Sequence, residues 1–394
     1  MIQQLVPLLV GAVAVGTLGC GPEPLSQSGP DTAPALAVTA QALSFRQISA
    51  GSFQSCGVTS DNRAYCWGNG PLGNGTSNSS SKPVAVSGGI HFVQVSVGGN
   101  HTCGVTTDNR AYCWGANGNG VLGDGTTTQR NSPVAVVGGH HFRQVDAGSY
   151  HTCGVTTDDE AFCWGYNKYG QLGDGSDFVQ RLRPVPVAGG LQFRRVSAGG
   201  LHSCGLTLGR RAYCWGWGGD GQIGDGKTFQ RRTPRAVAGG RDFTQVVAGG
   251  SHSCGVGTDG RAFCWGANYY GQIGDGTTTR RLAPTEVGGG RIFSGVSPGS
   301  AHTCGVTPAK VAYCWGWSYY GQLGNGSSGS DSPHTTPSKV AGGLLFSTVS
   351  AGGFHSCGVT TGSLAYCWGY NELGELGDGT TTSSSIPVAV IGPS

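Results

Sequence analysis

The chain has 394 residues, of which 74 are glycine and only 11% are charged, and its formal net charge is +3. So much glycine without a collagen period indicates many turns, and the small net charge gives no electrostatic argument for nucleic acid as a partner. Fifteen cysteines indicate metal or catalytic chemistry in a cytosolic protein, but disulfides in an exported one.

The first segment, residues 1–19, has the pattern of an export signal. Residues 5–19 form an apolar run that is too short to cross a bilayer as a helix. The run ends at Cys20 in a context similar to the lipobox of bacterial lipoproteins, although Thr17 stands where leucine is usual and no Lys or Arg precedes the run. We expect a lipoprotein-type signal peptide over residues 1–19 and lipidation of Cys20. Plain secretion after cleavage near Ala40–Ala42 is the alternative.

The next segment, residues 20–44, is predicted to be the lipidated cysteine and a flexible tether. It is rich in Pro, Ser and Ala and shows no periodicity. The membrane contact would then be made through the N-terminal lipid only, and stable attachment needs more than one acyl chain. The expected location is the bacterial cell envelope, with a lipid anchor, or the exterior as a secreted protein.

Seven cysteine pairs mark a repeat of about fifty residues that fills residues 45–394. In every pair the second cysteine follows the first by ten positions. The pairs are Cys56–Cys66, Cys103–Cys113, Cys153–Cys163, Cys204–Cys214, Cys254–Cys264, Cys304–Cys314 and Cys357–Cys367. They use fourteen of the fifteen cysteines, and Cys20 is the remaining one.

Each copy contains four short β-rich pieces, which in residues 142–190 read FRQVDA, HTCGVT, AFCWG and PVPV. Turn-rich loops separate these pieces, and no stretch has a long helical period. Four strands in each of seven units predict an all-β fold, a seven-bladed β-propeller of four-stranded antiparallel blades with one disulfide per blade. Radial closure would also protect the strand edges.

The spacing of the cysteines predicts that they face each other across a hairpin. If Cys254 opposes Cys264, a three-residue loop, Thr258–Gly260, remains, and its third position favours a positive φ. Gly, Asn and Asp accept that conformation, whereas Arg and Lys fit it less well. The third-position residues include Asn62, Asn109, Asp159, Arg210, Gly260 and Lys310. The turn chemistry therefore supports paired, disulfide-bonded cysteines.

Metal binding is the alternative interpretation of the repeated cysteines. A histidine lies two residues before the first cysteine in six copies, and Gln54 replaces it in the first copy. Zinc sites usually combine four ligands with spacings that this repeat does not supply. The recurring Gly-Asp-Gly segments offer one acidic residue each, whereas a calcium loop alternates several. We therefore expect no metal and no cofactor, histidines that bond backbone where blades meet, and aspartates that act as turn residues.

The run CWGYNKYGQLGDG at 163–175 resembles the regulator-of-chromosome-condensation (RCC1-type) repeat, and all seven copies share the resemblance. It implies a seven-bladed propeller, commonly closed by pairing N- and C-terminal strands in one blade, whose members mostly bind proteins through loops on one face. The paired cysteines look like those of exported bacterial members. β-Lactamase-inhibitor protein II, a secreted relative of similar architecture, blocks the active site of an enzyme. Nuclear members exchange nucleotide on a small GTPase and touch chromatin, a role that export argues against here.

Positions at which the seven copies differ indicate where binding could occur. Aromatic residues follow the Trp-Gly pair in several copies, in loops that should emerge on the same face. Tyr and Trp on a rigid scaffold are typical interface anchors. The candidate binding residues are Tyr166, Trp217, Tyr269, Trp317, Tyr319 and Tyr370. The alternative is that these rings fill gaps between blades, which the resemblance favours for Tyr169, Tyr270 and Tyr320.

Arginines also cluster after the third predicted strand of several copies. They form either a basic rim that attracts an acidic partner or an ordinary solvated loop surface. These residues are Arg130, Arg181, Arg183, Arg231, Arg232, Arg280 and Arg281.

These patterns favour a surface-tethered or secreted scaffold for protein–protein binding, with inhibition of an extracellular enzyme as one form of that role. A glycan-binding surface protein is the alternative, and an enzyme with a pocket at the central axis is a third. No P-loop or serine-nucleophile elbow is present, and the polar residues recur in every copy as structural residues do. We expect a monomer without catalytic residues that binds an unknown protein or glycan and no nucleic acid.

Overall fold

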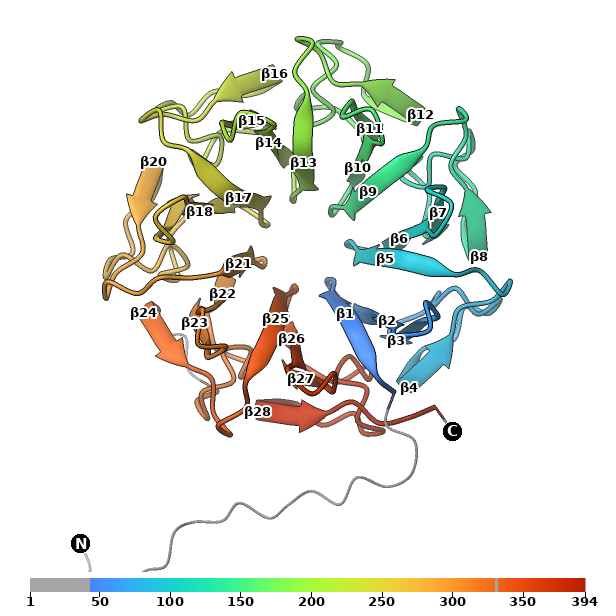
Figure 1. The fold of residues 1–394 in the computed structure, drawn as a ribbon, viewed down its shortest axis with the longest axis vertical. Helices are drawn as coiled ribbons and strands as arrows, with labels where there is room; N and C mark the ends of the chain where they lie inside the picture. The colour runs from blue at the N-terminus through green and yellow to red at the C-terminus, as the bar shows by residue number, and fades with distance from the viewer. Residues whose placement is uncertain (1–42, 330–331, 394) are drawn as a thin grey trace, which may run out of the picture. The chain divides into compact units, whose positions relative to one another are not determined.

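The computed structural model describes residues 43–329 and 332–393, which form seven four-stranded sheets arranged around a common axis (Figure 1). The predicted all-β, seven-bladed β-propeller is confirmed. No helix long and apolar enough to cross a membrane occurs among the described residues. The predicted signal peptide (1–19), the lipidation site Cys20 and nearly all of the tether lie outside the described residues.

The two inner strands of each blade carry the FRQVDA-like and HTCGVT-like segments. The innermost strands are β1 (Phe45–Ala50), β5 (Phe92–Val97), β9 (Phe142–Ala147), β13 (Phe193–Ala198), β17 (Phe243–Ala248), β21 (Gly295–Pro298) and β25 (Phe346–Ala351). The second strands are β2 (Gln54–Thr59), β6 (His101–Thr106), β10 (His151–Thr156), β14 (His202–Thr207), β18 (His252–Gly257), β22 (His302–Val306) and β26 (His355–Thr360).

The two outer strands carry the AFCWG-like segment and the proline-containing segment. The third strands are β3 (Ala64–Gly68), β7 (Ala111–Gly115), β11 (Ala161–Tyr166), β15 (Ala212–Gly216), β19 (Ala262–Gly266), β23 (Ala312–Gly316) and β27 (Ala365–Gly369). The outermost strands are β4 (Ser80–Ala85), β8 (Arg130–Ala135), β12 (Gln180–Pro186), β16 (Arg231–Ala236), β20 (Arg281–Glu286), β24 (His334–Lys339) and β28 (Ser384–Ala389). Proline is tolerated there because an edge strand can leave an N–H position unpaired.

The ring closes differently from what the family resemblance implies. Every sheet in the described part consists of four strands that are consecutive in sequence, so no blade combines N- and C-terminal strands. The expectation of a mixed closing blade is therefore wrong for this chain. The repeat begins with an innermost strand and supplies complete sets of four, so no strand is left over. Blade 1 instead packs Phe45 and Ile48 of β1 against Cys357 and Val359 of blade 7.

The predicted cysteine pairs face each other, and each blade carries one disulfide between its second and third strands. Cys254 opposes Cys264 in the β18–β19 hairpin, and the amide of Gly257 donates to the carbonyl of Arg261 across the predicted three-residue loop. The third loop residue has a positive φ in all seven hairpins. These residues are Asn62, Asn109, Asp159, Arg210, Gly260, Lys310 and Ser363.

The tryptophan of each repeat joins neighbouring blades, and all seven are fully buried. In blade 3 the indole N–H of Trp164 donates to the carbonyl of Val121 in blade 2 at 2.8 Å. Gly123 lies against that indole, where a Cβ atom would be only 2.7 Å from its nitrogen. A side chain at Gly123 would therefore clash, which explains the glycine before the aspartate in each Gly-Asp-Gly segment.

The histidine that precedes the first cysteine in six copies also joins neighbouring blades. It contacts a side-chain hydroxyl of the next blade, whereas the sequence led us to expect a backbone partner. The Nε2 of His151 lies 2.7 Å from the hydroxyl of Ser203 in the next blade, and that hydroxyl donates to the carbonyl of Gln171. The same pairing closes the ring, because His355 lies 2.7 Å from Ser55 of blade 1. With the repeat cysteines in disulfides, the described residues contain no group of ligands arranged to hold a metal.

Candidate functional site

Two sets of loops emerge on one side of the propeller because antiparallel strands alternate in direction. They are the loops after the innermost strand and after the third strand of each blade. We call this side the aromatic face. The β-hairpin loops after the second strands, such as Thr258–Gly260, and the connections between blades lie on the opposite face.

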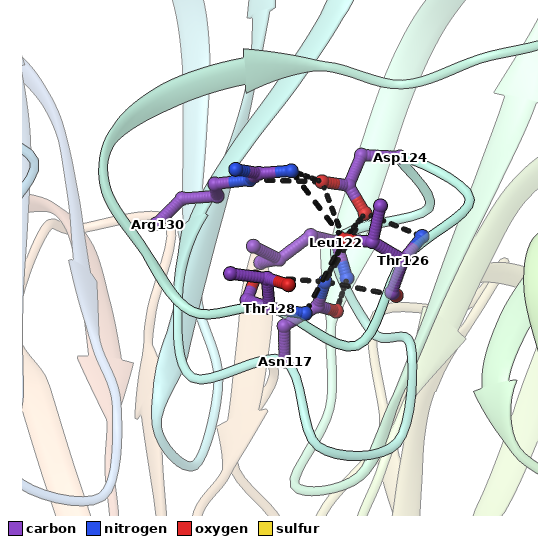
Figure 2. Close-up of polar contacts among 6 residues, drawn as sticks. All are labelled: Asn117, Leu122, Asp124, Thr126, Thr128 and Arg130. Carbon is purple, nitrogen blue, oxygen red and sulfur yellow. Dashed lines mark hydrogen bonds and ion pairs between the residues drawn. The ribbon is translucent and has the colours of Figure 1, made fainter.

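A hydrogen-bonded network fixes the loop after the third strand, as Figure 2 shows for blade 2. The side-chain amide of Asn117 donates to the Asp124 carboxylate at 3.1 Å and to the carbonyls of Thr126 and Thr128, and its oxygen accepts the amide of Leu122. Such satisfied networks hold a loop in one conformation.

The residue directly before this asparagine is the variable position that the sequence predicts to bind. Tyr166 precedes Asn167 in blade 3, and Tyr370 precedes Asn371 in blade 7. Both asparagines repeat the bonds to the loop aspartate and to the amide five residues later. These two tyrosines therefore sit on rigid supports, which lowers the entropic cost of using them in an interface.

A first aromatic group lies on blades 3 and 4. Tyr166 contacts Tyr150 with ring centroids 6.2 Å apart and Tyr169 at 6.3 Å. Tyr169 contacts Trp217 edge-on at 5.0 Å. The structure thus joins two of the predicted residues, Tyr166 and Trp217, through a tyrosine that was expected to fill a gap.

A second, larger aromatic group spans blades 5, 6, 7 and 1. Its members are Phe53, Tyr270, Trp317, Tyr319, Tyr320, Phe354 and Tyr370. Phe354 is central, with its ring 6.0 Å from Trp317, 5.8 Å from Tyr320 and 5.4 Å from Phe53. The geometry therefore brings Trp317, Tyr319 and Tyr370 into one connected surface.

Tyr269 stands apart from both groups among the predicted residues. Its side chain is 62% exposed, and its hydroxyl donates to Asp220 of blade 4 at 3.2 Å. Arg280 reaches the same blade through the carbonyl of Gly219. Tyr269 thus lies between the two aromatic groups rather than within either.

Sequence reasoning missed several aromatic residues of this face, among them the exposed Phe178 and Phe229 of third-strand loops and a set of three that share one position, Phe53, Tyr150 and Phe354. All three occupy one position in the loop after the innermost strand. The other copies carry Asn100, Leu201, Ser251 and Ala301 there. The sequence could have identified these residues, because this position varies among the copies just as the position after the Trp-Gly pair does.

The loop arginines form part of the structural network rather than a free basic rim. In blade 2 the guanidinium of Arg130 lies 2.8 Å from the carboxylate of Asp124. Arg181, Arg231 and Arg281 make equivalent pairs in blades 3, 4 and 5. Hydrogen bonds to Thr126 and Arg130 hold the pKa of Asp124 below its usual value despite the opposing effect of partial burial. Arg232 pairs with Asp177 of the neighbouring blade at 3.0 Å, so five of the seven arginines are neutralised locally.

Two titratable groups of blade 7 have shifted pKa values: Tyr370, a member of the second aromatic group, and Glu375. Burial, with a hydrogen bond to Glu372, raises the pKa of Tyr370 to about 12, so its hydroxyl remains a donor at physiological pH. Burial raises the pKa of Glu375 to about 7. Glu375 replaces the glutamine of blades 3 to 6 and is fully buried.

The axial pocket on the aromatic face has a volume of about 150 Å³ and is lined mostly by serine, glycine and alanine, together with Val97, Val247, Pro298 and one carboxylate, Asp146. These polar groups hold blades together: the hydroxyl of Ser96 accepts the amide of Ala147, and the carboxylate of Asp146 accepts the amide of Ala198. In blade 5 the equivalent residue is Val247, whose side chain has no acceptor, and the residue facing it in blade 6 is Pro298, which has no N–H to satisfy. Within the described lining, the hydroxyl of Ser96 donates to the carboxylate of Asp146 at 2.8 Å, so this pair too belongs to the contacts between blades.

Comparison with known proteins agrees with this architecture. Residues 93–392 match the RCC1-like domain family, and residues 45–74 and 61–105 match the regulator of chromosome condensation (RCC1) repeat. No curated protein sequence matches the chain.

Solved structures show the same fold at low sequence identity. Human WBSCR16 is 22% identical with a TM-score of 0.72, covering 79% of this chain and 85% of that one. Yeast RCC1 (Prp20), solved bound to Kap60, is 19% identical with a TM-score of 0.71, covering 90% and 84%. The ectodomain of the Arabidopsis thaliana receptor kinase ACR4 is 23% identical with a TM-score of 0.53, covering 82% and 95%.

The fold and the site define a seven-bladed propeller with one disulfide in each blade and with aromatic residues on the loops of one face. This chain belongs to the RCC1-like domain family. A propeller of this family is suited to binding other proteins.

Proposed function

We propose that this chain is a scaffold that binds another protein through its aromatic face. The observation that carries the proposal is the second aromatic group, in which Phe354 contacts both Trp317 and Tyr370, and Tyr319, which is 44% exposed, stacks on Trp317. Clustered Trp and Tyr residues dominate interface energetics, and Tyr370 of this group sits on the rigid support of Asn371. A yeast relative was solved bound to the protein Kap60, which supports protein binding rather than catalysis.

We propose further that the protein is an exported bacterial lipoprotein, anchored through Cys20 or secreted, and a monomer. The seven disulfides support an oxidising compartment, because such bonds are rare in reducing ones. The role that suits an exported scaffold of this kind is inhibition of an extracellular enzyme, in the manner of β-lactamase-inhibitor protein II. Projecting aromatic anchors fit the concave, largely apolar sites of enzymes.

Glycan binding is the second candidate for the same surface. The rings of Trp317 and Tyr319 lie 18° from parallel with centroids 6.1 Å apart. Together with the exposed rings of Tyr269 and Tyr270, they provide flat apolar surfaces. Free sugars would compete with a glycan partner and leave a protein partner in place.

Affinity capture tests the proposed function. The immobilised chain is offered envelope and secreted proteins beside a variant with Trp217→Ala and Trp317→Ala. Alanine already occupies this position in blades 2 and 5, as Ala116 and Ala267, so the variant should fold. A partner held by the native chain and lost by the variant supports the proposal. If the native chain and the variant retain the partner equally, Trp217 and Trp317 are not part of the binding surface.

A further inference from the structure

A second hollow lies on the opposite face, near the start of the innermost strands. It has a volume of about 690 Å³ and is lined by residues of β1, β5, β9 and β13 and by hairpin-loop residues of blades 3 and 4. This volume falls within the range of small-molecule sites. The axial pocket described above is lined instead by the ends of the same strands.

The hollow carries an excess of positive charge. Its charged lining consists of Arg143, Arg194, Arg195 and Asp159. Arg143 is neutralised by Asp159 at 2.6 Å, although its Nη1 is buried without a hydrogen-bond partner. The side chains of Arg194 and Arg195 are exposed and have no hydrogen bond or ion pair with any described residue. Two uncompensated guanidinium groups therefore face the same space.

Arg195 departs from a pattern of inter-blade bonds that four of the seven blades share; blades 6 and 7 carry Gly295 and Thr348 at this position. In blade 3 the equivalent residue is Gln144, whose amide both donates to the carbonyl of Val196 and accepts its N–H in the next blade. Gln47, Gln94 and Gln245 make the same pair of bonds. An arginine has no acceptor atom and cannot reproduce them, so blade 4 gives up an inter-blade contact at this position.

Arginine occupies the position of Arg194 in blades 1 and 3 as well, where Arg46 and Arg143 each donate to the carbonyl of the phenylalanine that begins the next blade. Arg194 differs from them in lacking such a partner in the described part of the chain. The equivalent hydroxyls of Thr244, Ser294 and Ser347 donate to a carbonyl of the neighbouring strand in their own blades. In blade 1 the guanidinium of Arg46 reaches the carbonyl of Thr59. Arg194 makes no such bond with the described residues, so its guanidinium, unlike those of Arg46 and Arg143, is not used in holding the blades together.

We propose that this hollow binds a small anion that carries two or more carboxylate or phosphate groups. Arginine presents several N–H donors in a planar fork that matches the oxygens of either group. One anionic group would be held by Arg194 and Arg195, and a second would lie near the unsatisfied Nη1 of Arg143. The site lies on the opposite face from the proposed protein-binding surface and is independent of that function.

Isothermal titration calorimetry of the full chain, with its disulfides intact, tests the proposal. Citrate and pyrophosphate serve as the carboxylate and phosphate probes. The test variants are Arg195→Gln and Arg194→Thr, because Gln144 and Thr244 occupy these positions in other blades. Arg235→Thr is the matched control: Arg235 is exposed on β16 outside the hollow, and it removes the same charge.

We expect one anion to bind per chain, and each test variant to weaken binding about tenfold, as loss of a charge-assisted hydrogen bond does. The control should bind as the native chain does, and Arg195→Gln should leave the melting temperature equal or higher. Tighter binding of citrate or of pyrophosphate would show whether the hollow prefers carboxylate or phosphate groups. Absence of binding by both anions, undiminished binding in the test variants, or an equal loss in Arg235→Thr would overturn the proposal.

Discussion

Six buried histidines make the propeller sensitive to acid. Burial lowers the pKa of His101 to about 4 and those of His151, His202, His252, His302 and His355 to about 3. The hydroxyl facing His151 donates to a carbonyl, so it accepts the Nε2–H of a neutral ring. A charged imidazolium at these positions would be buried without a compensating charge.

We therefore predict cooperative unfolding as the pH falls through the window between 6.5 and about 3. The folded pKa lies below the unfolded one, so the stabilisation is complete above 6.5 and is lost as the unfolded chain takes up protons. Each histidine contributes about 1.4 kcal/mol per pH unit within the window. Near-ultraviolet circular dichroism against pH measures the transition.

A His202→Gln variant is the control for this prediction, since Gln54 fills the equivalent position in blade 1. It removes one titrating group, so the free energy of unfolding should depend less steeply on pH, by about 1.4 kcal/mol per unit. A pH dependence identical to that of the native chain would contradict the assignment of the histidines as the acid-sensitive groups.

Glu375 should destabilise the native chain at alkaline pH. Burial raises its pKa to about 7, above that of an unfolded glutamate, so the native state favours the protonated form. Its stabilisation is present at low pH and is lost as the pH rises through 7. We expect Glu375→Gln, which restores the residue of blades 3 to 6, to raise the free energy of unfolding by up to about 3 kcal/mol at pH 8 and little at pH 4. Urea unfolding at the two pH values measures the difference, and equal effects at both would contradict it.

At the scale of single elements, replacing an unsuitable third residue of a hairpin loop should make the protein more stable. Lys310 has a φ of 65° in the loop between β22 and β23, a conformation that costs an ordinary residue about 1–2 kcal/mol and asparagine less. Lys310→Asn should raise stability by about 1 kcal/mol, measured as a shift in the denaturation midpoint. The reverse change, Asn109→Lys, should lower stability by a similar amount; a gain in both variants would rule out this explanation.

The disulfides should act locally, each on its own blade. Replacing Cys254 and Cys264 together by alanine removes a cross-link that closes a loop of about eleven residues, for a loss of about 2 kcal/mol. Because a propeller blade contacts only its neighbours, amide hydrogen exchange should accelerate in β18 and β19 and remain unchanged in β6 and β7 across the ring. Uniform acceleration in all blades would show that the cross-links stabilise the ring as a whole.

At the scale of the whole molecule, the repeat made the blades predictable. A constant ten-residue cysteine spacing and a loop residue tolerant of positive φ are local features, and they predicted the hairpins, the disulfides and the number of blades. Ring closure was not predictable, since it depends on where the repeat begins relative to the strands. The His355–Ser55 pair that completes the ring joins residues 300 positions apart.

The functional surface was only partly predictable for the same reason. Variability after the Trp-Gly pair identified Trp317 and Tyr370, which share the second aromatic group. Phe354 and Phe53 come from a different loop, and their contacts with these rings depend on how blades 6, 7 and 1 are placed around the axis. Likewise, the clustering of arginines in the sequence left open a basic rim or a solvated loop surface, and it did not reveal that Arg130 pairs with Asp124 of its own loop.

The central claim is that the aromatic face is the binding surface, and hydrogen–deuterium exchange of the chain with and without its captured partner tests it most directly. Loops that carry Phe53, Trp317 and Phe354 should gain protection in the complex. Loops of the opposite face that carry Leu208 and Ile292, both exposed apolar residues, should not. Protection confined to the opposite face would contradict the claim.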